Sequence, residues 1–547
     1  MACHLLDEPW IPVRIADGVV ERIAPWRITE RGRRGHFLDV VSVRPDFDGA
    51  LLEFLIGLVQ TALTPANEDG WFDRWETPPG PDQLREALEP FRDAFVLDGD
   101  GPRFMQDRTA LGQGDDLKPI AWLFMDAPTE NTEKENRDLF IKRRGFQRLC
   151  PGCAATALFT LQTCASSGGR GHYSSLRGKG PLSTLVLGPD LWHTVWANVL
   201  SRNHLNAHGT HSSVLRFPWM PSKGRHASKR QVLPNMVHPV YRYWGMPRRI
   251  WLVFQESAFP CDLCGLEAGP TVAEYAAAPH GNDYQGPWRH PLTPYRILPD
   301  GKPLPIESAV DGARYRHWLG LTLGGKSGKL TTEPAQVVRV FASRRKDLDG
   351  GRPEFRIRAY GYEMDKTKPM KARGFCFGEM PAWSFADSKL RDAFAFEVQR
   401  LVSAADYVAG KLKKAIFEAI VHRHQGGRQR GMLAGRTLFA SFVARFWSDT
   451  ESAFFAQLPE VHQAVRKRSE TLPLREAWRS RLVAAAMHLF EEATGAVGAG
   501  GGDPKRVAKA QRALLFAVEP WSKTMQKLLD LPPPAQSPGK VKAGALA

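Results

Sequence analysis

The sequence predicts an α+β fold, with a large mixed region over residues 1–384, a four-helix bundle over 385–530 and a disordered tail over 531–547. Two observations predict this division. At 547 residues the chain is too long for one ordinary hydrophobic core, so a second domain is expected. Strand and short helix patterns fill the first part, whereas long alanine-rich segments with apolar residues at three- and four-residue spacing fill the last part.

The mixed region begins with a predicted hairpin and two predicted helices. Residues 5–24 contain two apolar runs around Asp17-Gly18, a dipeptide typical of hairpin turns. Residues 46–63 show apolar side chains at helical spacing, so we expect a buried helix capped by Asp46. A shorter helix is expected over 84–95. Residues 97–107 lack the spacing of an EF-hand calcium loop and are interpreted as a structural turn.

The stretch 136–181 combines two basic loops with a cysteine pair and an apolar run. Its first loop carries Phe140 among basic residues, and its second is glycine-rich and ends at Ser175-Leu176-Arg177-Gly178. Cations that satisfy phosphates beside a ring that contacts a base or sugar suit a nucleic-acid probe. An ordinary solvated loop remains the alternative for the polar segment 130–146, which we expect to be disordered without a ligand.

Two Cys-x-x-Cys pairs predict a structural zinc site. Cys150 and Cys153 form the first pair, and Cys261 and Cys264 form the second. The two-residue spacer lets both sulfurs of a pair reach one ion, and four protein thiolates leave no open position for a catalytic water. The pairs lie far apart in the sequence, so unmetallated buried thiols or a redox role remain alternatives.

Two other motifs invite a chemical role but lack its context. His204, His208 and His211 have near-helical spacing, yet no acidic residue follows them as zinc hydrolases require, so surface or loop packing is expected. Residues 320–327 satisfy the P-loop pattern with Lys326 as the phosphate-binding lysine. Neither a buried strand before it nor a helix directly after it is predicted, and a P-loop ATPase is kept only as an alternative.

Residues 356–363 and 375–379 predict a second hairpin, with Lys366, Thr367, Lys368 and Pro369 at its tip. A rigid cationic finger of this kind suits insertion into a duplex. Four helical segments are then expected, separated by Gly426-Gly427, Pro459 and the glycine run that ends at Gly502. They cover residues 387–424, 436–457, 474–494 and 504–530.

The overall charge predicts a polyanionic partner. Lys and Arg number 74 against 58 Asp and Glu, which gives a formal net charge of +16. Such an excess favours nucleic acid or a nucleoprotein, because neutralised phosphates release condensed counterions. No secretory signal opens the sequence and no apolar run has membrane-spanning length. We therefore expect a cytoplasmic protein with reduced thiols and no membrane partner.

These pieces together resemble the CasA family, the large subunit of the type I-E CRISPR surveillance complex called Cascade. The resemblance covers nearly the whole chain. It depends on the cysteine pair with its glycine loop, on the helical C-terminal region, and on the ordered segments LLDEPWIPVR, LDGDGPRFMQD, SSLRGKGP, HPLTPY, GYEMD and MKAR.

The resemblance implies a non-catalytic subunit that reads the protospacer-adjacent motif of duplex DNA, helps to open the duplex for pairing with the guide RNA, and presents the site to a helicase-nuclease acting in trans. Its implied partners are the other Cascade subunits, CRISPR RNA and target double-stranded DNA. Carried over by position, a loop aromatic that binds the complex and DNA falls on Phe140. The motif-reading loop falls on Gly169, Arg170 and Gly171, and the strand-separating wedge on Lys366, Thr367 and Lys368.

Two departures from the family pattern concern motif reading and the wedge. Family members can use a lysine shortly after the second cysteine pair, where this chain has Ala276-Ala277-Ala278-Pro279-His280, so His280 is a candidate substitute. The wedge tip carries Lys-Thr-Lys-Pro in place of a glutamine-type tip, which implies strand separation that depends more on charge. A zinc protein that binds nucleic acid without sister subunits is the remaining alternative.

Overall fold

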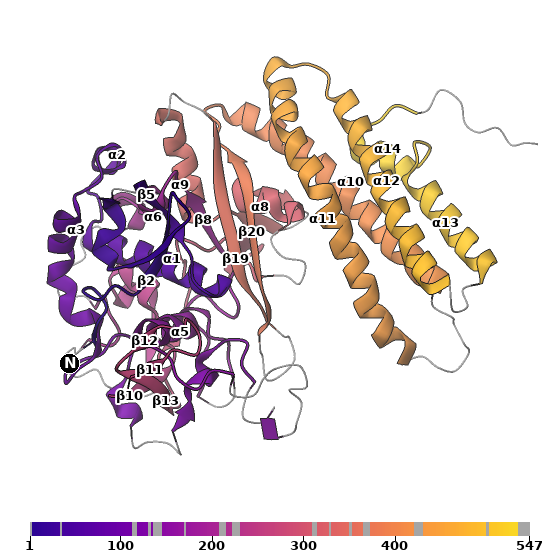
Figure 1. Cartoon of the computed structure of the whole chain (residues 1–547). Helices are drawn as coiled ribbons and strands as arrows, with labels where there is room; N and C mark the ends of the chain where they lie inside the picture. Colours follow the sequence, from indigo (N-terminus) through magenta and orange to yellow (C-terminus); the bar gives the residue numbers. More distant parts are fainter. Residues whose placement is uncertain are drawn as a thin grey trace, which may run out of the picture. The chain divides into compact units, whose positions relative to one another are not determined.

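The computed structural model describes residues 3–32, 35–111, 117–128, 133–134, 145–168, 171–206, 215–220, 230–256, 258–308, 314–327, 330–348, 353–364, 372–420, 430–498 and 503–533. The chain forms two compact units, Met1–Gly312 with Lys326–Ser384 and Ala313–Gly325 with Phe385–Ala547. The second unit thus combines the C-terminal region with a short segment from inside residues 1–384. Figure 1 shows the elements of both units coloured along the sequence.

The predicted first hairpin is confirmed. Strands β2 (Ile11–Ile15) and β3 (Val20–Ile23) pair antiparallel, and Gly18 in the turn between them has a φ of +87°, which favours glycine. The four-stranded sheet has the order β3-β2-β5-β4, with β4 at Arg31–Gly32 and β5 at Gly35–Val40.

Helix α1 (Pro45–Ala62) forms the centre of the first unit. It contacts α5 (Pro151–Cys164), α6 (Leu191–Ala197) and β5, and the fully buried Phe54 packs edge-on against Phe95, Phe104 and Phe159. The buried helix is as predicted, but its cap is not Asp46. The N-cap residue is Arg44, two residues before the expected Asp46, because Pro45 favours the first position of a helix. The Arg44 side chain makes no capping hydrogen bond.

The second predicted hairpin is present and longer than expected. Strands β19 (Glu354–Met364) and β20 (Ala372–Trp383) pair along their whole length, and β8 (Ser183–Leu187) extends the sheet on the other side of β19. Buried Arg358 on β19 pairs with both Asp39 and Glu379, so the charge of this side chain is neutralised inside the unit.

The remaining sheets of the first unit are small. Strand β10 (Arg249–Gln255) pairs with β13 (Thr271–Ala278), which pairs in turn with β7 (Lys118–Pro119). The other strands are β1 (Cys3–His4), β6 (Val96–Asp98), β9 (Gln231–Val232), β11 (Phe259–Pro260), β12 (Glu267–Ala268), β14 (Asp283–Tyr284), β15 (Tyr295–Ile297), β16 (Pro303–Pro305), β17 (Gly325–Ser327) and β18 (Leu330–Glu333).

Short helices cover these sheets. The helix expected over 84–95 is α3 (Pro81–Leu88) followed by a 3-10 helix over Glu89–Phe95. Arg344, at the end of α9, stacks over the Trp71 ring at 4.1 Å and pairs with Glu68. The other helices of this unit are α2 (Glu68–Glu76), α7 (Arg202–Leu205) and α9 (Gln336–Arg344).

The second unit is helical, and α10 contacts all four later helices. Pro459 does not separate two segments as expected, because it lies inside α11. Pro459 is exposed while Leu458 and Val461 are buried, so packing of the inner face keeps the helix intact. The last predicted segment is two helices, with Glu519 as the C-cap residue of the first. The elements are α8 (Trp318–Thr322), α10 (Ser388–Ile420), α11 (Arg430–Lys467), α12 (Leu472–Gly498), α13 (Pro504–Val518) and α14 (Lys523–Leu529).

Within the residues that the structure describes, no helix has both the length and the apolar character needed to cross a bilayer. Of the tail predicted to be disordered, residues 534–547 lie outside the described part.

Candidate functional site

The fold brings the two cysteine pairs together. Cys150 is the N-cap residue of α5 and Cys153 lies in its first turn, while Cys261 and Cys264 lie in the turn between β11 and β12. The four sulfur atoms all lie within 4.8 Å of one another, and Cys150 Sγ is 3.7 Å from Cys264 Sγ. None of the four forms a disulfide.

Hydrogen bonds to the backbone hold the two cysteine-bearing segments side by side without the sulfurs. Leu149 and Val272 exchange two hydrogen bonds of 2.9 Å, and Asp262 Oδ2 accepts hydrogen bonds from the backbone amides of Gln147 and Arg148. Arg148 also stacks over the Phe259 ring at 4.0 Å. The segment before α5 is therefore attached to the β11–β12 turn on both sides of the cysteines.

The cluster fits a metal with four thiolate ligands. A tetrahedral ion with bonds of about 2.3 Å separates its sulfurs by about 3.8 Å, close to the observed Cys150–Cys264 distance. Hydrogen bonds among the four thiols lower the pKa of Cys261 and Cys264 and raise the pKa of Cys150 and Cys153, so the second pair takes the thiolate form first. These four residues would hold the ion, and it would act as a structural cross-link.

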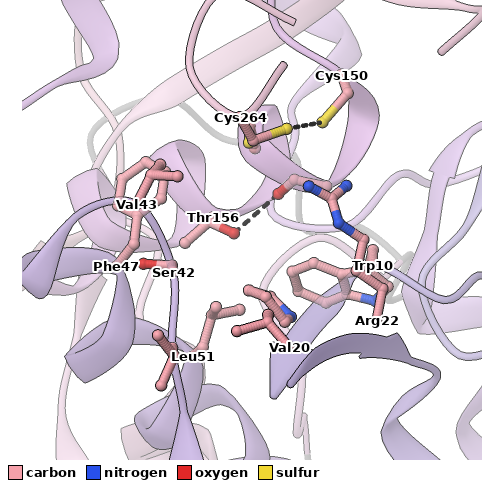
Figure 2. A pocket seen from close by; sticks show the side chains of 14 residues that line it. Trp10, Val20, Arg22, Ser42, Val43, Phe47, Leu51, Cys150, Thr156 and Cys264 are labelled. Carbon is pink, nitrogen blue, oxygen red and sulfur yellow. Dashed lines mark hydrogen bonds between the residues drawn. The ribbon is translucent and has the colours of Figure 1, made fainter. Parts of the chain in front are cut away.

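A cavity of about 130 Å³ lies beside the cluster. Figure 2 shows Trp10, Val20 and Leu51 among its lining side chains, with Arg22 extending from β3 toward the sulfurs. Arg22 donates a hydrogen bond to the Cys264 sulfur, and its pKa is raised although burial opposes the charge. A cation at this position stabilises the negative charge of thiolates.

The end of the glycine loop contacts the segment where the resemblance expects a motif-reading side chain. Gly171 O accepts a hydrogen bond of 2.8 Å from His280 N, and both residues have positive φ values, +81° and +64°. A Cβ on Gly171 would lie 2.8 Å from Pro279 Cβ and 3.0 Å from His280 N. Tyr173 OH lies 3.5 Å from His280 Nδ1. Glycine is thus required at position 171 by both conformation and space.

The comparison with known proteins identifies the family. Residues 4–489 match the family described as CRISPR-associated protein Cse1. The chain belongs to the Cse1 family. The resemblance to CasA drawn from the sequence motifs is thereby confirmed.

Solved structures of this fold accompany the family match. The structure of Thermus thermophilus CasA (Cse1) superposes with a TM-score of 0.67 at 17% identity and covers 96% of this chain and 99% of that one. Thermobifida fusca Cse1 gives 0.68 at 18%, covering 97% and 98%. A chain of a structure titled "CRISPR RNA-guided surveillance complex" gives 0.64 at 16%, covering 94% and 99%. At these identities the likeness shows a shared fold.

Several of the predicted DNA-binding residues of this Cse1-family chain lie outside the described residues. They are Phe140, Gly169, Arg170, Lys366, Thr367 and Lys368. The structure does describe what precedes and follows them. The glycine loop closes with a hydrogen bond from Gly168 N to His172 O of 3.1 Å, and the hairpin is paired up to Met364 and Ala372.

Arg177 is not a cation of the loop surface as the sequence pattern suggested. Its side chain is 2% exposed and donates to Glu53, Thr293 and Ser183 at distances of 2.7, 2.8 and 2.6 Å. Glu53 lies on α1 and Thr293 in a loop far along the chain. No local pattern in the sequence marks this arginine as buried.

The other two motifs have a structural explanation in this Cse1-family chain. Gly325, Lys326 and Ser327 form strand β17 after helix α8, whereas a P-loop needs this sequence in the turn that opens a helix. The backbone therefore does not fit an ATP site. His204 Nδ1 lies 3.1 Å from Glu68 Oε1, and His208 and His211 lie outside the described residues.

The glycine loop should loosen in mild acid. Burial, together with the positive charges of Arg248, Lys118 and His280, lowers the pKa of His172 to about 4. The unfolded chain, with an ordinary histidine pKa of about 6.5, then takes up the proton first, so stability is complete above that value and declines as the pH falls toward 4. From about pH 7 to about pH 5 the part of this loss that comes from His172 should be at most about 2 kcal/mol, beside the parts from His238 and His290, whose pKa values burial also lowers. Denaturant unfolding of the wild type and of a His172→Gln variant at both pH values measures the change in the free energy of unfolding. An equal change in the variant and the wild type would show that His172 does not contribute to it.

Proposed function

We propose that this Cse1-family chain is the large, non-catalytic subunit of a type I-E Cascade complex. In this role it recognises a protospacer-adjacent motif in duplex DNA, promotes strand separation and R-loop formation, and helps to recruit a helicase-nuclease. Its partners are the other Cascade subunits, CRISPR RNA and target DNA. The family match and the full-length fold similarity to a chain of an RNA-guided surveillance complex support this proposal. The net charge of +16 suits the nucleic-acid partners.

One observation supports motif reading most directly. The hydrogen bond between Gly171 and His280 joins the glycine loop to the segment after the second cysteine pair, the two places that the family resemblance implicates. We assign the motif contact to Gly169, Arg170 and Gly171, with His280 in place of the absent lysine and Phe140 on the preceding loop. A glycine loop lets the backbone approach the minor groove closely. That groove mainly distinguishes A·T from G·C pairs, so tolerance of several motifs is expected.

We assign zinc to the four-cysteine cluster, since four cysteine sulfurs within 4.8 Å of one another suit a zinc ion with four thiolate ligands. Its role would be to fix the start of α5 and the β11–β12 turn, from which the basic loop before Cys150 and the segment leading to His280 extend. The guide RNA would supply sequence specificity by base pairing, and the protein would supply backbone contacts and duplex destabilisation.

Co-purification with sister subunits and guide RNA tests the proposal as a whole. The chain should join an RNA-containing complex, and the complex should bind motif-bearing duplexes more tightly than duplexes that lack the motif. Equally tight, motif-independent DNA binding by the isolated chain would instead favour a zinc protein that acts alone.

Alanine at both Lys366 and Lys368 should slow duplex opening by about tenfold or more, because two cations would no longer reach the separating strands. Binding to a target with a pre-melted bubble should change much less. The Lys302→Ala variant, which alters an exposed lysine in a turn of the same unit, is the matched control. An equal loss on both substrates would refute the wedge role.

A further inference from the structure

We propose that residues 171–180 form a rigid strap that couples motif reading to strand separation, with Gly180 as the positioning residue at its hairpin end. The proposal rests on the function proposed above and goes beyond it, because it assigns a role to residues 172–180, which contact neither the motif nor the tip of the wedge.

The two ends of the strap contact the two proposed DNA-binding elements. At one end, Gly171 O accepts the hydrogen bond from His280 N. At the other end, Gly180 has a φ of +54°, and a Cβ there would lie 2.3 Å from Met364 Cγ and 2.6 Å from Tyr362 O. Met364 is the last paired residue of β19 before the hairpin tip. The strap therefore joins the motif-reading loop to the base of the wedge.

The middle of the strap is fixed to the core of the unit. Arg177 donates three hydrogen bonds, to Glu53, Thr293 and Ser183, and its side chain is almost fully buried. Ser175 N donates to Ala165 O at 2.8 Å, and Ser175 Oγ donates to Gly178 O at 2.8 Å. A segment held in this way keeps its two ends at fixed positions, so it sets the position of the hairpin base relative to the motif-reading loop.

The hairpin is attached to the same carboxylate as the strap. Glu53 Oε2 accepts from Arg177, and Glu53 Oε1 accepts from Tyr360 OH at 3.2 Å. Gly49 O, 3.0 Å from Tyr360 OH, shares the same hydroxyl proton, and Tyr362 OH donates to Asp46. Helix α1 thus holds both the strap and the β19–β20 hairpin. The contact between Gly180 and Met364 is then the place where a change in the strap reaches the hairpin.

A Gly180→Val variant in the assembled complex tests the strap. The added side chain should displace Met364 and the hairpin base while leaving the contact between Gly171 and His280 in place. We expect opening of the first base pairs, followed by 2-aminopurine fluorescence on an intact motif-bearing duplex, to slow by about tenfold or more. Discrimination between duplexes with and without the motif at the initial binding step should stay within about twofold, as should affinity for a pre-melted bubble.

Gly374→Val is the matched control, because Gly374 lies on β20 of the same hairpin and a Cβ there meets nothing within 4 Å. Met364→Ala removes the side chain that contacts Gly180 and leaves the glycine backbone unchanged. It should also slow opening of the intact duplex without weakening bubble binding, and it serves as the test where Gly180→Val folds poorly. Opening at the wild-type rate in both variants, or an equal loss on the bubble substrate, would overturn the strap. Absence of motif-dependent opening in the wild-type complex would instead contradict the proposed function itself.

Discussion

A Cys153→Ser variant should lose its metal and several kcal/mol of stability. The four sulfurs link the first turn of α5 to the β11–β12 turn, over a hundred residues away in sequence, and removing one ligand leaves an incomplete coordination shell. We expect a loss on the order of the 2–5 kcal/mol that removal of a native disulfide costs. Metal content by mass spectrometry and guanidinium unfolding measure the two effects.

The consequences should be greatest near the site. Without the metal, the Leu149–Val272 hydrogen bonds and the Asp262 contacts are left to hold the two segments together, so hydrogen exchange should increase around residues 147–149 and 259–272 before the whole unit unfolds. Cys164→Ser is the matched control, because Cys164 ends the same helix and lies outside the cluster. Full metal occupancy and unchanged stability in Cys153→Ser would contradict the assignment.

A Gly171→Val variant should abolish motif-dependent binding by the assembled complex. A positive φ costs a branched residue about 1–2 kcal/mol, and the clash with Pro279 and His280 adds about 1–3 kcal/mol. The loop must then leave its position, and we expect affinity for a motif-bearing duplex to fall by about 30-fold or more. Binding titrations with duplexes that do and do not carry the motif measure it.

Gly168→Ala provides the control for that experiment. Gly168 lies in the same loop, has no positive φ, and a Cβ there meets nothing within 4 Å. Its motif preference should match that of the wild type. An unchanged preference in Gly171→Val, with the hydrogen bond to His280 disrupted, would remove Gly171 from the motif-reading loop.

Features set by local chemistry were predictable from the sequence. The Asp17-Gly18 turn, the buried helix behind Pro45 and the hairpin that ends near Met364 follow from backbone preferences and hydrophobic periodicity over a few residues. The cysteine cluster was predictable because a two-residue spacer lets both thiols of a pair reach one point in space. The order of the family motifs along the chain predicted the family.

Features set by long-range packing were not predictable. Arg177 looks like its basic neighbours, and only Glu53, far away on α1, makes it a buried anchor. The proximity of Gly171 to His280 requires the β10–β13 pairing to place Pro279 beside the loop. Pro459 is a helix breaker by local propensity, yet packing of the inner face of α11 outweighs that penalty.

The helical unit is discontinuous in sequence, which affects how it can be exchanged between relatives. Tyr315, from the segment 313–325, stacks on Phe454 with ring centroids 4.4 Å apart and bonds to Thr450. A chimaera joined at residue 385 would combine the C-terminal helices of one protein with the Tyr315 segment of another. An exchange that keeps Tyr315 with its own helices needs two crossover points in the gene, one on each side of the codon for Tyr315, in addition to the junction near 385.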